Sequence, residues 1–222
     1  MKKIALLSWS SGKDCAYALH VLRQQPGIEV VGLYCTVNRE FSRVAMHAVR
    51  IELLRQQAES VGLPIHILNI PYPCSNSQYE AVMEKFIGKV KQEKIKYMAF
   101  GDIFLQDVRQ YREDKLAGTG IEPLFPLWGR STGELSQEMV NSGLKAQITC
   151  VDPKFLSPEF AGQEYNSSFL KKIPGNVDPC GENGEFHTFV YDGPIFNKKL
   201  NFSIGEVVQR DSFVFADLLP GQ

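Results

Sequence analysis

The chain has 222 residues, with 24 lysines and arginines against 25 aspartates and glutamates and a formal net charge of −1. This length predicts one large domain or a domain with a modest appendage, and the balanced charge argues against broad nucleic-acid binding. Five cysteines without CxxC spacing indicate a reducing compartment. No apolar run approaches the ~20 residues of a membrane helix, and the first run ends at Ser8, too early for a signal peptide. We therefore expect a cytoplasmic protein that binds no membrane.

Strand and helix patterns alternate along the first two thirds of the chain. Apolar and β-branched runs predict strands at residues 4–7, 29–37, 64–70 and 97–103. Apolar residues at helical spacing predict helices from Cys15 to Pro26, over 46–61, from an N-cap at Ser77, and over 108–117. A helix over 132–142 and a strand over 145–152 form a fifth unit. This alternation favours an α/β fold, a doubly wound parallel sheet with helices on both faces.

The pattern changes after residue 152. Residues 153–185 contain four of the twelve prolines and are expected to be rich in loops. The segments "FHTFVYD" and "DSFVFADLL" then predict two strands without a helix between them. We therefore expect two domains, a doubly wound domain over 1–152 and a smaller C-terminal α+β subdomain over 153–222.

The turn between the first strand and the first helix is rich in small residues. Such a turn directs backbone N–H groups and a helix N-terminus at one point, where they bind phosphate oxygens. Leu7 and Asp14 exclude a Walker A motif. The alternative is a small-residue turn before an amphipathic helix, but its place at the carboxyl edge of the sheet favours a ligand. The residues expected to bind a nucleotide are Ser8, Ser10, Ser11, Gly12, Lys13, Asp14 and Cys15.

A second loop, punctuated by glycines, has the sequence "CGENGEFHTF". Its carboxylates, Glu182 and Glu185, flank Asn183 and could bind an amine, position ammonia or act as a general base. His187 would share the face of Glu185 in an extended segment. The alternative, open on this stretch alone, is a solvated turn that leads into an edge strand.

Two further pairs are expected at the same edge of the sheet. His47 and Arg50 lie three residues apart near the start of the predicted helix 46–61, and we expect them to contact phosphate or an anionic substrate. The alternative is a packed histidine and a salt-bridged arginine. Gly101 and Asp102 end the fourth strand, where the glycine would admit the nucleotide and Asp102 would contact metal or ribose. A plain strand-ending turn is the alternative.

Residues 10–15 resemble the Ser-Gly-Gly-Lys-Asp-Ser loop of the PP-loop ATP pyrophosphatases, with Ser11 for the first glycine and Cys15 for the last serine. The loop at residues 181–186 resembles the Gly-Glu-Gly-Gly-Glu-type motif of the diphthine–ammonia ligase-like family, in a G-E-N-G-E-F form. Segments 46–50, 100–113 and 125–129 are also similar to that family. The resemblance implies a HUP-like (adenine nucleotide alpha hydrolase-like) fold and a ligase that adenylates a carboxylate, releases pyrophosphate and forms an amide with ammonia.

The resemblance also implies roles for particular residues. Lys13 would neutralise the leaving pyrophosphate, Asp14 would hold Mg²⁺, and Glu182 and Glu185 would complete the catalytic set. The implied cofactors are ATP and Mg²⁺, and the partners are a small-molecule or protein carboxylate acceptor and ammonia, with a homodimer left open. The residues expected to bind substrate are His47, Arg50, Asn183 and His187.

Two other functions remain open from the sequence. A PP-loop enzyme that thiolates tRNA would use Cys180 or Cys150 for sulfur transfer, although without CxxC spacing we expect Cys74, Cys150 and Cys180 to be buried or incidental. A nucleotide-binding sensor would bind ATP without turning it over.

Overall fold

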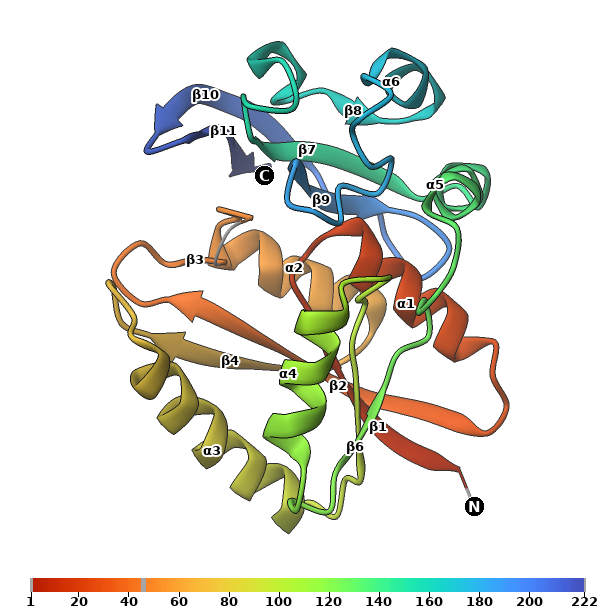
Figure 1. Ribbon diagram of the computed structural model, residues 1–222, viewed down its shortest axis with the longest axis vertical. Helices are drawn as coiled ribbons and strands as arrows, with labels where there is room; N and C mark the ends of the chain where they lie inside the picture. The colour runs from red at the N-terminus through yellow and green to blue at the C-terminus, as the bar shows by residue number, and fades with distance from the viewer. Residues whose placement is uncertain (1, 45–46, 222) are drawn as a thin grey trace.

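Two β-sheets organise the chain in the computed structural model, which describes residues 2–44 and 47–221 (Figure 1). The parallel strands of the first sheet lie in the order β4-β2-β1-β5-β6. A short strand, β3, pairs antiparallel with the end of β2. The strand bounds are β1 Lys3–Ser8, β2 Ile28–Asn38, β3 Arg43–Val44, β4 Ile65–Ile70, β5 Tyr97–Ala99 and β6 Glu122–Leu124. The predicted doubly wound parallel sheet is confirmed.

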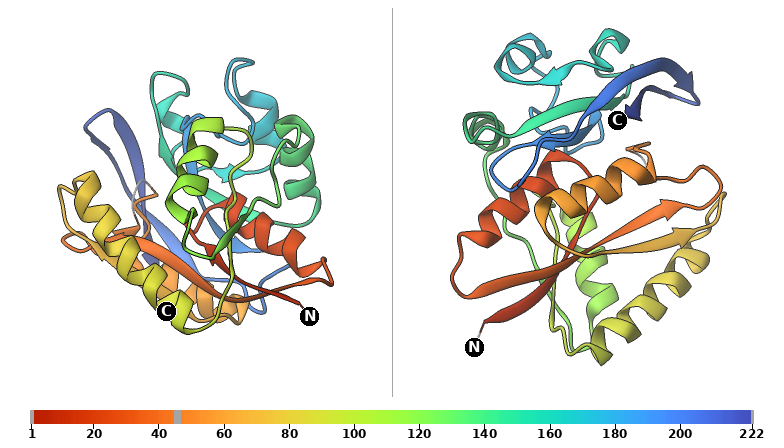
Figure 2. Two further views of the ribbon diagram at one scale, coloured as in Figure 1. Left: turned by 60° about the horizontal axis from the view of Figure 1, so that its bottom comes forward. Right: turned by 180° about the vertical axis from the view of Figure 1, so that it is seen from behind.

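Helices cover both faces of this sheet (Figure 2). α1 (Lys13–Arg23) and α2 (Ile51–Val61) lie between the first sheet and the second. α3 (Asn76–Gln92) and α4 (Gln106–Leu116) lie on the opposite face. Within the described part of the chain, no helix combines the length and the apolar character needed to cross a membrane.

Two helix starts differ from the prediction. Ser75, not Ser77, is the N-cap of α3, because Ser75 and Gln78 form a reciprocal capping box. The predicted helix 46–61 begins only at Ile51, after an extended Arg50. Met46 lies outside the described residues, but Ala48 has a left-handed φ of 54°, which is incompatible with a continuous helix there. His47 and Arg50 therefore precede the helix instead of sharing one of its faces.

The second sheet is antiparallel and is centred on β7 (Lys145–Val151). β7 pairs with β8 (Glu164–Tyr165), β9 (Phe186–Asp192) and β11 (Phe213–Pro220), and β10 (Phe202–Arg210) extends the sheet beyond β11. The expectation that β7 would continue the first sheet is wrong. Six of its seven residues are buried, and a run buried on both faces does not distinguish a parallel strand from a central antiparallel one.

The segments on either side of β7 also belong with the second sheet. α5 (Thr132–Asn141) leads into β7, and a 3₁₀ turn (Pro158–Phe160) and α6 (Ser167–Lys172) cover the outer face of the second sheet. Residues 153–185 thus contain short elements among their loops. Because β7 belongs to the second sheet, we propose that the domain division lies before it and not after residue 152.

Candidate functional site

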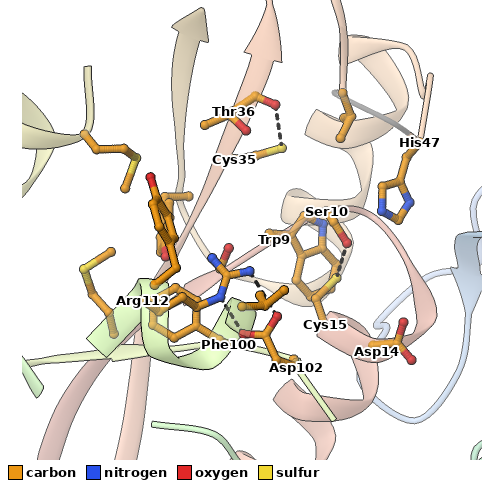
Figure 3. Close-up of a pocket in the computed structure, with 18 of the residues that line it drawn as sticks. Trp9, Ser10, Asp14, Cys15, Cys35, Thr36, His47, Phe100, Asp102 and Arg112 are labelled. Atoms are coloured by element: carbon orange, nitrogen blue, oxygen red, sulfur yellow. Dashed lines mark hydrogen bonds and ion pairs between the residues drawn. The ribbon is translucent and has the colours of Figure 1, made fainter. Parts of the chain in front are cut away.

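A pocket of about 770 Å³ lies at the carboxyl edge of the first sheet (Figure 3). Its walls come from the loop after β1, the end of β2, α3, α4 and the loop before β9. This volume is in the range of small-molecule and cofactor sites. The predicted site residues that line it are Ser8, Ser10, Lys13, Asp14, Cys15, His47, Gly101, Asp102, Glu182 and His187.

The loop after β1 has the backbone conformation of a glycine at its centre. Ser11 has a φ of 71°, in the left-handed region that a serine adopts only with strain. The serine therefore stands where the PP-loop pattern has glycine, in a backbone conformation that favours glycine. Gln57 fixes the loop from α2, because its Nε2 donates to the Ser11 carbonyl at 3.0 Å and its Oε1 accepts from Trp9 Nε1 at 2.9 Å.

Strand β9 holds the same loop from the other side. The Lys13 amide donates to Thr188 Oγ1 at 3.0 Å, and the Val190 amide donates to the Ser11 carbonyl at 2.9 Å. Thr188 thereby satisfies one of the free N–H groups at the start of α1. The two sheets are thus joined at the loop that is expected to bind phosphate.

Lys13 is buried, with 2% of its side chain exposed. Its Nζ lies 2.9 Å from Asp14 Oδ2 and donates a hydrogen bond to the Cys180 carbonyl. Burial opposes ionisation of the amine, but the neighbouring Asp14 outweighs it and raises the pKa of Lys13. Lys13 is therefore a cation between the loop after β1 and the loop before β9.

Glu182 lines the pocket from the loop before β9. Its Oε1 accepts a hydrogen bond from the Ile103 amide at 2.7 Å. Burial raises the pKa of Glu182 to about 7, so the carboxyl exchanges a proton near neutral pH. Glu182 and Lys13 are both among the residues that line the pocket.

Glu185 and Asn183 lie outside the pocket lining. Glu185 is 2% exposed and accepts hydrogen bonds from the Asp178 amide at 3.0 Å, the Asn183 amide at 3.1 Å and Asn183 Nδ2 at 3.0 Å. Asp178 in turn accepts from the Glu182 amide at 2.9 Å. In this conformation Glu185 and Asn183 fix the shape of the loop, while Glu182 faces the pocket.

His47 and His187 form a tilted ring pair on the pocket wall, with ring centroids 4.7 Å apart and ring planes at 43°. His47 Nδ1 lies 3.0 Å from the Thr188 carbonyl. Burial lowers the pKa of His47 to about 4 and the pKa of His187 well below its ordinary value. Both rings are therefore neutral near pH 7 and offer hydrogen bonds, not positive charge, to an anion.

Arg50 is not brought to the pocket. Its guanidinium binds Asp217 of β11, with Nη2 at 2.6 Å from Oδ2, and Arg43 binds the same carboxylate at 2.7 Å. This arrangement favours the alternative of a salt-bridged arginine, which here ties the segment before α2 to the second sheet.

Gly101 and Asp102 lie at the pocket but also have structural partners. A Cβ on Gly101 would stand 3.0 Å from the Asp14 carbonyl carbon and the Cys15 nitrogen, so the glycine admits the first turn of α1. Asp102 Oδ1 accepts from Arg112 Nη2 at 3.0 Å (Figure 3). Arg112 comes from α4.

Among the described residues, no group of three or more His, Cys, Asp or Glu side chains could hold a metal by itself. Asp14 is the carboxylate at the phosphate loop, and its side chain is 28% exposed. A Mg²⁺ that bridges nucleotide phosphates needs only one or two protein carboxylates. Asp14 therefore fits a magnesium bound together with a nucleotide.

Sequence reasoning missed several residues of the site. Thr188 and Gln57 form hydrogen bonds to the phosphate loop. Helices α3 and α4 form one wall of the pocket. No local pattern marks these residues, because their partners lie up to 175 positions away. The missed lining residues on α3 include Tyr79 and Met83.

Comparisons with known proteins match both halves of the chain. Residues 1–121 match the Diphthamide synthase N-terminal domain, and residues 131–215 match the Diphthamide synthase C-terminal domain. The diphthine–ammonia ligase of Bos taurus is 30% identical over 193 residues, which cover 79% of this chain and 70% of that protein. That of Homo sapiens is 29% identical over 191 residues, covering 83% and 70%. That of Schizosaccharomyces pombe is 33% identical over 232 residues, covering 96% and 38%. The chain belongs to the diphthamide synthase family.

Proposed function

We propose that the protein is an ATP-dependent ligase that adenylates a carboxylate, releases pyrophosphate, and forms an amide with ammonia. The observation that carries the proposal is the convergence of two loops on one pocket. The loop after β1 contributes Lys13 and Asp14, and the loop before β9 contributes Glu182. The relatives named diphthine–ammonia ligase support the same reaction class.

In this proposal ATP is held by the amides of the loop after β1 and the N-terminus of α1. Lys13 would neutralise the pyrophosphate, and Asp14 would hold Mg²⁺, which would supply positive charge to the phosphates. The acceptor carboxylate attacks the α-phosphorus and becomes an acyl-adenylate. Ammonia then attacks the acyl carbon, and AMP leaves. Glu182, whose pKa is about 7, accepts the proton that the nitrogen loses.

The other two functions have less support. Cys150 and Cys180 are buried, and burial raises the pKa of each thiol to about 12. A thiol that stays protonated is a poor nucleophile, so sulfur transfer to tRNA is not favoured. A non-catalytic sensor would have no use for a carboxyl that titrates near pH 7 inside the pocket.

Phosphorus NMR tests the proposal directly. The protein is incubated with ATP, Mg²⁺, ammonium and a panel of carboxylates that includes a diphthine-bearing protein. We expect AMP and pyrophosphate with at least one acceptor, and their loss in Lys13→Ala. Lys85→Ala is the matched control, because Lys85 is exposed on α3 and away from the pocket. Formation of ADP and phosphate would contradict cleavage between the α and β phosphates.

A further inference from the structure

The ammonium group of Lys13 lies in a set of partners that we call the Lys13 cage: Asp14, Cys180, Tyr165 and Phe186. Both Asp14 carboxylate oxygens lie within 3.0 Å of Nζ, and the Cys180 carbonyl accepts a hydrogen bond from it. The Lys13 Nζ lies over the rings of Phe186 and Tyr165, 5.2 and 5.6 Å from their centroids. Three oxygen acceptors and two ring faces around one nitrogen form a site for an ammonium group.

Contacts from several segments of the chain fix the positions of the cage residues. Tyr165 is 1% exposed, and its hydroxyl donates to the Pro179 carbonyl at 3.0 Å. Gly181 has a φ of 65°, and a Cβ there would stand 2.9 Å from Phe186. The buried Glu185 fixes the amides of Asp178 and Asn183. The Cys180 carbonyl is thus held in place from both sides of the loop.

The cage is continuous with the pocket, because Asp14 and Phe186 belong to both. Lys13 lines the pocket as well, and its long stem can direct the ammonium to either place. In the proposed reaction Lys13 moves to the pyrophosphate, because several phosphate charges attract it more strongly than one carboxylate does. The cage acceptors then face the pocket without their lysine.

We propose that the Lys13 cage is the binding site for the substrate ammonium ion, which takes the place of the Lys13 ammonium once Lys13 engages the ATP phosphates. This inference rests on the proposed function. Lys13 would thereby order the reaction, because ammonium enters the cage only after ATP is bound. One Asp14 oxygen, the Cys180 carbonyl and the rings of Tyr165 and Phe186 would contact the substrate nitrogen, which leaves the other Asp14 oxygen for Mg²⁺.

The bound NH₄⁺ gives one proton to the Glu182 carboxylate and becomes NH₃. The nitrogen lone pair forms the C–N bond to the acyl carbon, and the bond from that carbon to the AMP oxygen breaks with its electron pair on AMP. A second proton leaves the nitrogen to water, which yields the amide and AMP.

The first test needs neither ATP nor an acceptor. Lys13→Ala removes the resident ammonium, and the thermal unfolding midpoint is measured in ammonium, sodium, potassium and tetramethylammonium chloride at equal ionic strength. We expect a midpoint increase in ammonium alone for this variant, and none for the wild-type protein or Lys85→Ala. Adding Phe186→Leu should weaken the apparent ammonium affinity about 2- to 30-fold. An equal response to potassium, or no response to ammonium, would overturn the inference.

The second test uses the protein with an intact Lys13, so it does not depend on the folding of Lys13→Ala. With Mg²⁺ and the non-hydrolysable α,β-methylene analogue of ATP, the wild-type protein should acquire the ammonium-specific stabilisation. In turnover, Phe186→Leu should raise the KM for ammonium about 2- to 30-fold and leave the KM for ATP unchanged. An unchanged KM for ammonium would contradict the cage. A protein that shows ammonium binding but makes no AMP with any acceptor would instead refute the proposed function alone.

Discussion

The hydroxyl of Thr188 accepts a hydrogen bond from the backbone N–H of Lys13 at 3.0 Å, across 175 positions of the chain. Gly12, the N-cap of α1, has no side chain to cap the helix. A residue of the second sheet therefore supplies the cap that the local sequence lacks. This contact links the presence of the second sheet to the geometry of the phosphate loop.

Thr188→Val should lower the free energy of unfolding by about 1 kcal/mol, because it leaves the buried Lys13 amide without an acceptor. Urea denaturation measures the change. Thr188→Ser keeps the hydroxyl and should retain most of the stability. A larger loss in Thr188→Ser than in Thr188→Val would show that the methyl group, not the hydrogen bond, is the stabilising part.

Ser11→Gly should raise the free energy of unfolding by about 1 kcal/mol, because it relieves the strain of a serine at a φ of 71°. Within the described part of the chain, the buried Ser11 hydroxyl has no hydrogen-bond partner, so no side-chain hydrogen bond is lost. Ser11→Ala keeps the Cβ and serves as the control for the strain. A destabilised Ser11→Gly protein would contradict this account.

Gly12→Ala should destabilise the protein by about 1–3 kcal/mol, because the added Cβ would lie 2.7 Å from His47 Cε1. The φ of Gly12 is −87°, so the backbone itself accepts alanine. The double variant Gly12→Ala/His47→Ala should therefore recover stability relative to the sum of the single changes. Strict additivity in the cycle, measured by urea denaturation, would exclude His47 as the cause.

The Asp217 ion pairs should stabilise the protein only above strongly acidic pH. Burial opposes ionisation of Asp217, but hydrogen bonds and charges from Arg50 and Arg43 outweigh it and lower the pKa from 3.8 to about 2. A depressed pKa contributes stability above pH 4 that is lost as the pH falls towards 2. Asp217→Asn should cost about 1 kcal/mol at pH 6, since the pairs are partly exposed. Urea denaturation from pH 6 to 2 should show this difference shrink, and a difference that does not change with pH would contradict it.

Glu182→Gln should lower kcat for amide formation about 100-fold or more, the usual contribution of a general base. In the wild-type protein, kcat at saturating ATP and ammonium should fall as the pH drops through about 7, because Glu182 becomes protonated there. The variant should lose this limb of the pH profile. Glu84→Gln, at the exposed outer wall of the pocket, is the control and should keep it.

The first four β–α units of the first sheet, and the phosphate-type loop after β1, could be predicted because both are local patterns, whereas the short strands β3 and β6 were not predicted. An apolar run followed by helical spacing fixes a β–α unit, and the residues at 10–15 fix the chemistry of its turn. The two-carboxylate loop could also be found from its glycines. Which of its two carboxylates lines the pocket could not be predicted, because Glu182 and Glu185 lie three positions apart in one loop and no local pattern distinguishes them.

Tertiary structure decided what local patterns leave equivalent. β7 is buried on both faces and therefore suits either sheet. It lies in the second sheet because it pairs with β9 and β11, which come later in the chain. Arg50 forms an ion pair with Asp217 because α2 starts later than its apolar spacing predicts, so that Arg50 precedes the helix. Glu185 accepts hydrogen bonds within its own loop. Glu182 lines the pocket instead, where it accepts a hydrogen bond from the Ile103 amide of another segment. The sequence by itself determined the elements and the kind of chemistry, and contacts between distant segments determined which side chains perform it.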